Sequence, residues 1–335
     1  MMAGRGRSGR RIAASLACAL LLAGACESPT VAVDPARWTE TPISVNADGD
    51  LLHGTLTRPA GASAFDIVLI HPSVGNTDRN GNEPGQRNDS LARLAHGLAG
   101  RGIASVRIDM RGIGASEAAF TRQDMDMTPA VLAADAKLWA DRLRAEEGTR
   151  HVYLLGHGQG ALTVTLAATL ARPDGLILIA GAGIRGGEYL RRHIRAQGAG
   201  AEYVTVSDAI ISELEAGRRV VGVPTDFRFY FREDTQGYLI EWFGYDPVQE
   251  LTKSSAPTLV VQGTNDLEVA TGDARRLAGA RNGITLLLID GMNHVLRIAP
   301  KDAKANFWTY KDFTKPLAPG LVDAIADFIR SVPAR

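Results

Sequence analysis

Cysteine is almost absent from this 335-residue sequence, occurring only at Cys18 and Cys26, close to the N-terminus. The chain beyond residue 26 therefore has no thiol that could form a disulfide, act as a nucleophile or bind a metal ion. The seven histidines are scattered and show none of the spacings typical of a metal site. We accordingly expect no metal ion and no other cofactor.

The chain also lacks net charge, because 37 Lys and Arg residues balance 37 Asp and Glu residues. A neutral chain without runs of like charge has no broad electrostatic footprint for nucleic acid or for an anionic membrane surface. Hydrophobic residues make up 45% and charged residues 22% of the sequence. This composition is typical of a globular protein that is large enough to bury a substantial core.

No apolar run at the N-terminus is long enough for a stable membrane-spanning helix, since the run at residues 12–25 has too few residues. Four arginines precede this run and small residues end it, which is the pattern of a secretory signal peptide. The run stops at Cys26 in the string LAGAC, which resembles the lipobox of bacterial lipoproteins. That resemblance implies export and attachment to the bacterial cell envelope, on the periplasmic side, through a lipidated Cys26 alone. The alternative is an ordinary cleaved signal that happens to contain a cysteine.

Residues 1–26 are thus expected to be a signal peptide, and residues 27–38, which are polar and contain proline, a linker. The body at residues 39–335 begins with a hairpin signal at residues 41–59, around Asp48-Gly49-Asp50. Six apolar runs follow that are typical of strands buried on both faces of a parallel sheet: 66–70, 103–108, 152–155, 176–180, 258–261 and 285–289. Helical spacing is found between and after them, at 90–99, 129–145, 161–171, 273–279 and 321–331.

This alternation predicts an α/β fold with a mostly parallel, doubly wound sheet and a hairpin at its start. One interval, residues 181–253, interrupts the alternation with charged segments that contain aromatic residues. An insertion between consecutive core strands, at the sheet edge where ligands bind, is expected to form a helical cap over a pocket. An additional helical layer without a gating role is the alternative.

Residues 151–170, HVYLLGHGQGALTVTLAATL, have the pattern of a buried strand, a sharp glycine-rich turn and an apolar helix. Hydrolases place a nucleophilic serine in the middle of such a turn, in the motif G-x-S-x-G. Here the central residue is Gly158, so the nucleophile position is vacant. His157, in the same turn, is expected to pack beside the sheet.

Four further strings support a family resemblance: HPSVGNTDRNGN at 71–82, DMRGIGAS at 109–116, GTND at 263–266 and GMNHVL at 291–296. With the order of strands and helices, they make residues 39–335 resemble the α/β-hydrolases. The strings are most similar to a bacterial branch related to serine aminopeptidases and dienelactone hydrolases. The resemblance implies an α/β-hydrolase fold and a small-molecule partner, which is an ester or related acyl compound bound as substrate or ligand.

The residues that would carry this chemistry follow the predicted strands. Asp266 and His294 come after consecutive apolar runs and should emerge at the same sheet edge as the turn at Gly158. Asp266 would orient the imidazole of His294, which would transfer the proton. The backbone N–H groups of Gln159 and of Ser73 or Val74 would line an oxyanion hole. The structural alternatives are a helix cap for Asp266 and an ordinary loop histidine for His294.

Glycine at position 158 removes the atom that would form an acyl-enzyme, and it also relieves the backbone strain of the turn. Three interpretations follow: a hydrolase disabled by loss of its serine, a slow hydrolase in which His294 and Asp266 activate water, and a non-catalytic pocket (a pseudoenzyme) that binds a small molecule. Ser73 as a relocated nucleophile is disfavoured, because its loop is expected to lie across the pocket from the turn. Pro72 lacks an N–H group and stands where this loop usually has glycine, which affects the oxyanion hole.

Overall fold

The computed structural model describes residues 37–120 and 127–333. The predicted signal peptide with Cys26, and residues 27–36 of the predicted linker, lie outside the described residues. Within the two described ranges, no helix combines the length and the apolar character needed to cross a bilayer.

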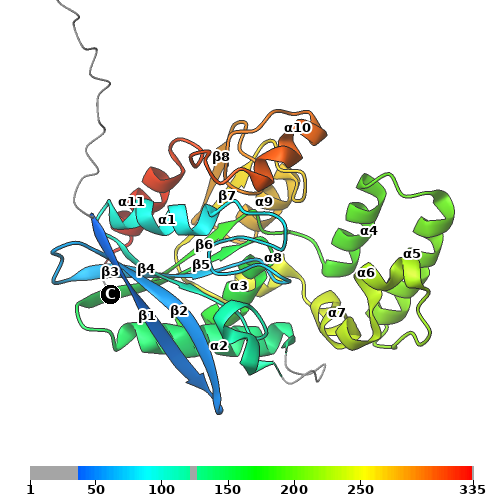
Figure 1. The fold of residues 1–335 in the computed structure, drawn as a ribbon, viewed down its shortest axis with the longest axis horizontal. Coiled ribbons are helices and arrows are strands. Elements are labelled where there is room, and N and C mark those ends of the chain that lie inside the picture. Colours follow the sequence, from blue (N-terminus) through cyan, green and yellow to red (C-terminus); the bar gives the residue numbers. More distant parts are fainter. Residues whose placement is uncertain (1–36, 121–126, 334–335) are drawn as a thin grey trace, which may run out of the picture. The chain divides into compact units, whose positions relative to one another are not determined.

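An eight-stranded sheet forms the centre of the fold, with the strand order β1-β2-β4-β3-β5-β6-β7-β8 (Figure 1). Strands β1 and β2 form a hairpin, β2 pairs antiparallel with β4, and all the remaining pairs are parallel. The strands are β1 (Trp38–Ala47), β2 (Asp50–Pro59), β3 (Phe65–His71), β4 (Ala104–Ile108), β5 (Thr149–His157), β6 (Gly175–Ile179), β7 (Thr258–Gly263) and β8 (Ile284–Ile289). The fold class predicted from the sequence is confirmed.

The hairpin turn has positive φ angles at both of its central residues, 55° at Asp48 and 103° at Gly49. This is the conformation that a two-residue turn needs to match the twist of its strands, and an Asp-Gly pair adopts it readily. The predicted hairpin is therefore explained by its turn residues.

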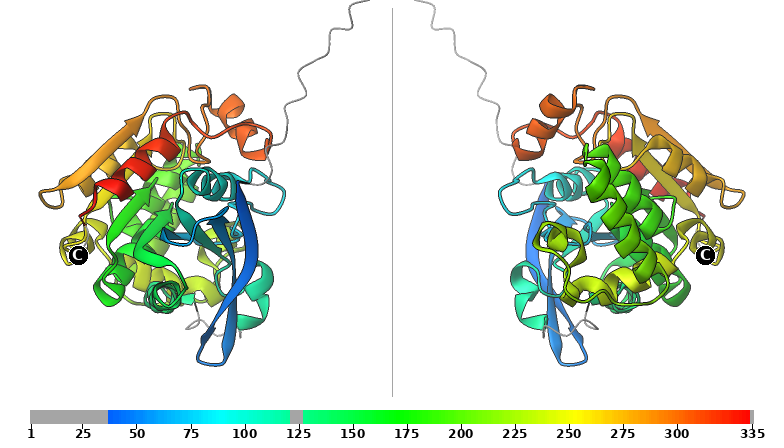
Figure 2. Two further views of the ribbon diagram at one scale, coloured as in Figure 1. Left: turned by 90° about the vertical axis from the view of Figure 1, so that its left-hand side faces the viewer. Right: turned by 90° about the vertical axis from the view of Figure 1, so that its right-hand side faces the viewer.

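Helices cover both faces of the sheet (Figure 2). Successive strand residues point to opposite faces, so that Ile67 and Leu69 pack with one group of helices and Val68 and Ile70 with the other. The first group contains α2 (Pro129–Arg144), α3 (Gly160–Ala171) and α9 (Thr271–Ala278); the second contains α1 (Ser90–Ala99) and α11 (Leu321–Ser331). These strands are buried on both sides, which is why they read as continuous apolar runs.

The chain between β6 and β7 is helical and has a hydrophobic cluster of its own, centred on Ile211, Leu214 and Phe231. Figure 1 shows α4 to α7 gathered on one side of the sheet. We call this segment the cap: it contains α4 (Gly186–Ala196), α5 (Ala201–Glu215), η3 (Thr225–Phe227), α6 (Arg228–Phe231), η4 (Glu233–Thr235), α7 (Gln236–Gly244) and α8 (Pro247–Thr252).

Three short helices were not anticipated from the sequence: η1 (Gly114–Ala119) after β4, and α10 (Ala303–Trp308) and η5 (Thr309–Lys311) after β8. Each has six residues or fewer, so none contains enough turns to show a helical period.

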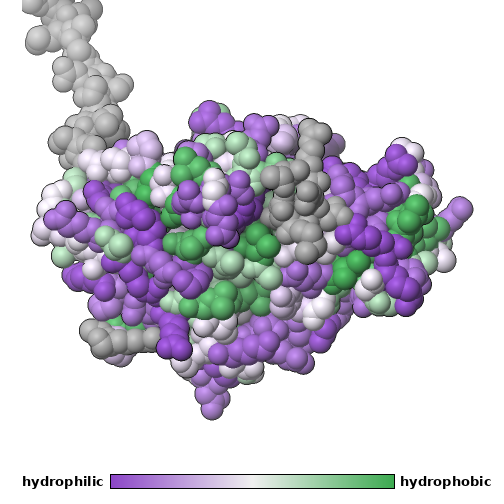
Figure 3. All heavy atoms as spheres, turned by 90° about the horizontal axis from the view of Figure 1, so that it is seen from below, coloured by the Kyte–Doolittle hydropathy of each residue, from purple (hydrophilic) through white to green (hydrophobic). Residues whose placement is uncertain are grey.

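Figure 3 shows one face of the molecule, on which hydrophilic residues predominate and hydrophobic side chains gather near the middle.

Candidate active site

The turn between β5 and α3 has the geometry of a nucleophile elbow. Gly158, at its centre, has a φ angle of 56°, in the left-handed region that strains any residue except glycine. Gly160 is required because a Cβ there would lie 2.3 Å from the Pro72 carbonyl oxygen. The loop after β3 is therefore packed directly against the elbow. The structure places no side chain at the nucleophile position, as the sequence indicated.

Asp266 and His294 meet beside this elbow. The Nδ1–H of His294 donates to Oδ2 of Asp266 at 3.0 Å. The other carboxylate oxygen of Asp266 accepts the backbone N–H groups of Glu268 and Val269, at 2.8 and 3.0 Å. Nε2 of His294 lies 3.4 Å from the point that a Cβ on Gly158 would occupy. The imidazole is thus anchored by Asp266 and directed at the vacant nucleophile position.

Glu268 is a second carboxylate at His294, and its Oε2 lies 3.5 Å from Nε2. Burial by itself would lower the pKa of His294, but the carboxylates of Glu268 and Asp266 outweigh it and raise this pKa to about 10. Burial would likewise raise the pKa of Asp266, whereas the charge and hydrogen bond of His294 lower it. At neutral pH the resting site therefore contains an imidazolium between two carboxylates.

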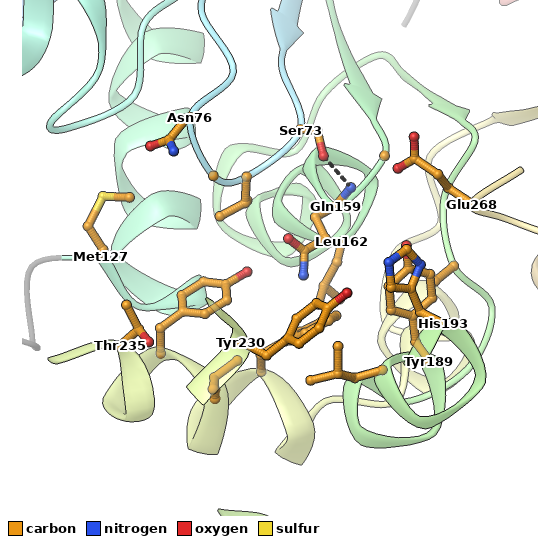
Figure 4. Close-up of a pocket in the computed structure, with 18 of the residues that line it drawn as sticks. Ser73, Asn76, Met127, Gln159, Leu162, Tyr189, His193, Tyr230, Thr235 and Glu268 are labelled. Atoms are coloured by element: carbon orange, nitrogen blue, oxygen red, sulfur yellow. Dashed lines mark hydrogen bonds between the residues drawn. The ribbon is translucent and has the colours of Figure 1, made fainter. Parts of the chain in front are cut away.

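Ser73 lies at the elbow, and the expectation that its loop would lie across the pocket is wrong. Its Oγ is 2.6 Å from the point that a Cβ on Gly158 would occupy, and it accepts the Gln159 N–H at 3.4 Å (Figure 4). The reason is that β3 and β5 are neighbours in the sheet. The loops that follow them leave the same sheet edge side by side.

The proposed oxyanion residues all face one cavity of about 580 Å³ between the sheet edge and the cap. Ser73, Val74 and Gln159 line it together with Gly158 and His294. The cap contributes mostly aromatic and aliphatic side chains to the opposite wall, among them Tyr189, Leu190, Phe229, Tyr230, Tyr238 and Trp242 (Figure 4). A polar sheet edge thus faces a largely apolar wall.

Comparison with known proteins shows which proteins this arrangement is similar to. A family model described as Serine aminopeptidase, S33 matches residues 85–206. Est1E from Butyrivibrio proteoclasticus has the same fold, with a TM-score of 0.56, 16% identity, and coverage of 87% of this chain and 99% of that one. The enol-lactonase from Burkholderia xenovorans LB400 gives a TM-score of 0.52 and 19% identity, with 86% and 100% covered. The chain therefore has the α/β-hydrolase fold.

One curated relative of this chain is esterase EstD from Thermotoga maritima, which is 24% identical over 282 residues. The match covers 79% of this chain and 61% of EstD, so the chain spans about three fifths of that relative's length. The named relatives include an esterase and an enol-lactonase.

One residue of the site, Glu268, was not singled out by sequence reasoning, and His157 was expected only to pack beside the sheet. Glu268 could have been noticed, because it lies two positions after Asp266 in the same turn. Burial lowers the pKa of His157 to about 3, so this ring is neutral. It lies 2.8 Å from the His294 carbonyl oxygen through Nε2, and the two ring centroids are 4.7 Å apart. His157 therefore supports the backbone of His294 as well as packing beside the sheet.

Among the described ranges, no cluster of three or more His, Cys, Asp or Glu side chains could hold a metal ion.

Proposed function

We propose that this α/β-hydrolase hydrolyses carboxylic esters that carry an apolar acyl or alcohol group of aromatic size. The observation that carries the proposal is the Asp266–His294 pair, hydrogen-bonded at 3.0 Å and directed at the elbow at the floor of a capped cavity. An imidazole held in this way by a buried carboxylate is the proton carrier of acyl-transfer sites.

The cavity supports the proposed class of substrate. Its volume of about 580 Å³ lies within the range of small-molecule sites, and its cap wall is rich in aromatic side chains. Offset or edge-to-face contacts with Tyr230, Tyr238 and Trp242 would favour a planar or bulky apolar group. The scissile carbonyl would then lie at the polar edge, next to the N–H of Gln159.

A second candidate function is binding without turnover. Glycine at 158 leaves no elbow nucleophile, and the raised pKa of His294 leaves little neutral imidazole to act as a base at pH 7. Both observations favour a pocket that holds a small apolar carboxylic ester or acid. The two candidates differ in whether His294 matters for chemistry or only for the shape and charge of the pocket.

Hydrolysis of a panel of p-nitrophenyl and naphthyl esters by the unmodified protein, at pH 7 to 10, separates the candidates. Ester hydrolysis that disappears in His294→Ala, but persists in His151→Ala, supports the enzyme. His151 is a matched control because it pairs with Asp66, at 2.9 Å, and does not line the cavity. Absence of hydrolysis throughout that range, with saturable binding of the same esters in both variants, would overturn the enzyme and leave the binding pocket.

Export with lipid attachment at Cys26 is also proposed, on the basis of the N-terminal sequence pattern alone. It would place the cavity in the cell envelope, where the substrate would be an extracytoplasmic ester.

A further inference from the structure

We propose that the hydroxyl of Ser73 is the nucleophile of this site and replaces the missing elbow serine. This inference rests on the proposed ester hydrolysis and names the residue that forms the covalent intermediate. It is carried by the shared position of three groups: the vacant elbow, the Ser73 hydroxyl and the catalytic nitrogen of His294.

The Ser73 hydroxyl, as it lies in the structure, and a side chain at position 158 would compete for the same space. A Cβ on Gly158 would lie 2.6 Å from Ser73 Oγ, a distance that real Cβ atoms essentially never show, and 3.0 Å from Ser73 Cβ, so the serine would have to shift. The Ser73 hydroxyl can therefore occupy this space only because residue 158 is glycine. The sequence has no side chain at the elbow, but the fold brings the Ser73 hydroxyl of the neighbouring loop to within 2.6 Å of the Cβ position at Gly158.

The hydroxyl lies where a proton carrier and an anion-stabilising donor meet. His294 Nε2 borders the same point as Ser73 Oγ, at 3.4 Å from the Cβ position at Gly158. The N–H of Gln159, at the N-terminus of α3, donates to Ser73 Oγ at 3.4 Å. The positive end of a 12-residue helix favours negative charge on a neighbouring oxygen. Hydrogen bonds between nucleophile and base commonly tighten only when the substrate binds, and the proposal requires that Ser73 Oγ and His294 Nε2 form one in the substrate complex.

The backbone around Ser73 is held in place from two sides. Burial lowers the pKa of His71 to about 4, so its ring is neutral, and its Nδ1–H donates to the Pro72 carbonyl oxygen at 2.8 Å. Gly160 packs against the same carbonyl. Pro72 further restricts the loop, because its ring locks φ. The hydroxyl is thus presented from a rigid segment that is anchored to both β3 and α3.

The chemical step balances with these groups alone. Ser73 Oγ forms a bond to the ester carbonyl carbon as its proton passes to neutral His294 Nε2, and the carbonyl electron pair moves onto the oxygen beside the Gln159 N–H. When this intermediate collapses, the bond to the alcohol oxygen breaks, and that oxygen takes the proton from His294. A water molecule then repeats the sequence on the acyl-Ser73 ester and releases the acid.

Labelling with a fluorophosphonate probe, followed by mass spectrometry of the peptides, tests the proposal directly. We expect the probe on Ser73, with labelling faster at pH 9 than at pH 7. We also expect kcat to fall on the order of 10³-fold or more in Ser73→Ala, by analogy with the loss of other serine nucleophiles. Ser63→Ala is the matched control, since this serine is exposed on a loop away from the cavity.

Two further variants keep the test decisive if Ser73→Ala is poorly folded. Ser73→Cys should retain acyl transfer and become sensitive to iodoacetamide. The double variant Gly158→Ser with Ser73→Gly should move the probe to position 158. Hydrolysis that survives Ser73→Ala and remains dependent on His294 would overturn the Ser73 nucleophile and leave the proposed esterase with activated water. Probe on Ser73 without turnover of any ester would instead contradict the proposed function and support the reactive hydroxyl.

Discussion

At the scale of single residues, the site depends on which atoms lie close to the Cβ position at Gly158. Two features disfavour a side chain at position 158. The left-handed φ of 56° would strain its backbone, and the hydroxyl of Ser73 would contact its Cβ too closely. Glu268 acts on the same region electrostatically, because it holds His294 protonated. Stability and reactivity are therefore coupled through neighbouring atoms, and single substitutions can separate their contributions.

Gly158→Ala should lower the free energy of unfolding by roughly 1–3 kcal/mol, because alanine would be strained at this φ and its Cβ would meet Ser73. In the double variant with Ser73→Gly, the stability lost through the contact between Cβ and Ser73 should be recovered, whereas the stability lost through backbone strain should not. Urea unfolding of the two single variants and the double variant measures the coupling. Strict additivity of the two single changes would contradict the close contact.

Glu268→Gln should shift the pH dependence of ester hydrolysis to lower pH. Glu268 is the largest of the charges that raise the pKa of His294 to about 10, so removing its charge lowers that pKa. Because the base is neutral imidazole, kcat/KM rises as the pH approaches this pKa. In Glu268→Gln this rise should therefore occur at lower pH. Glu83→Gln is the matched control, because the carboxylate of Glu83 raises the pKa of His294 less than those of Glu268 and Asp266 do, and its removal should give a smaller shift. An unchanged pH profile in Glu268→Gln would show that His294 is not held by this carboxylate.

At the scale of elements, the sheet and the cap are packed around different hydrophobic clusters, and the cavity lies between the sheet edge and the cap. The sheet is packed by α1, α2, α3, α9 and α11, whereas the cap is packed around its own cluster with Ile211 and Phe231 at its centre. Cap side chains form the apolar wall of the pocket, and the sheet edge carries Ser73, Gln159 and His294. Changes in the cap core should therefore affect substrate binding before they affect the sheet.

Phe231→Ala should loosen the cap at a cost of about 3–5 kcal/mol to its packing, since this side chain is fully buried in the cap cluster. Phe231 does not line the cavity, so an increase in KM would act through the position of the cap wall. Hydrogen exchange should rise across α4 to α7 and stay unchanged in β3 to β7. Val221→Ala is the control because Val221 is 84% exposed. Uniform loss of protection in the sheet would show a single cooperative core instead.

At the scale of the whole molecule, the proposed lipid anchor would decide where the protein acts. Cys26→Ser should move the protein from the membrane fraction to the soluble fraction of its cells, since the acyl chains would no longer hold it at the bilayer. Fractionation and the mass of the mature N-terminus measure this. A wild-type protein that is already soluble, with an unmodified N-terminus, would identify an ordinary cleaved signal.

Most of the fold could be predicted from the sequence because its signals are local. Strands buried on both faces appear as apolar runs, helices as periodic patterns, and the elbow as a glycine-rich turn that follows a strand. The helices Ser90–Ala99 and Leu321–Ser331 have the predicted bounds. The Asp-Gly pair at 48 and 49 predicted its hairpin for the same reason, since the turn depends on the φ angles of two adjacent residues.

The sequence by itself determined the α/β-hydrolase fold, the vacant position at Gly158, and the Asp266 and His294 that face it. Only the tertiary structure decided that Ser73 lies beside Gly158 and that the carboxylate of Glu268 raises the pKa of His294. Ser73 reaches Gly158 because β3 lies next to β5, although 85 positions separate the two residues in the chain. Such contacts depend on strand order and side-chain rotamers, which no local pattern of residues specifies.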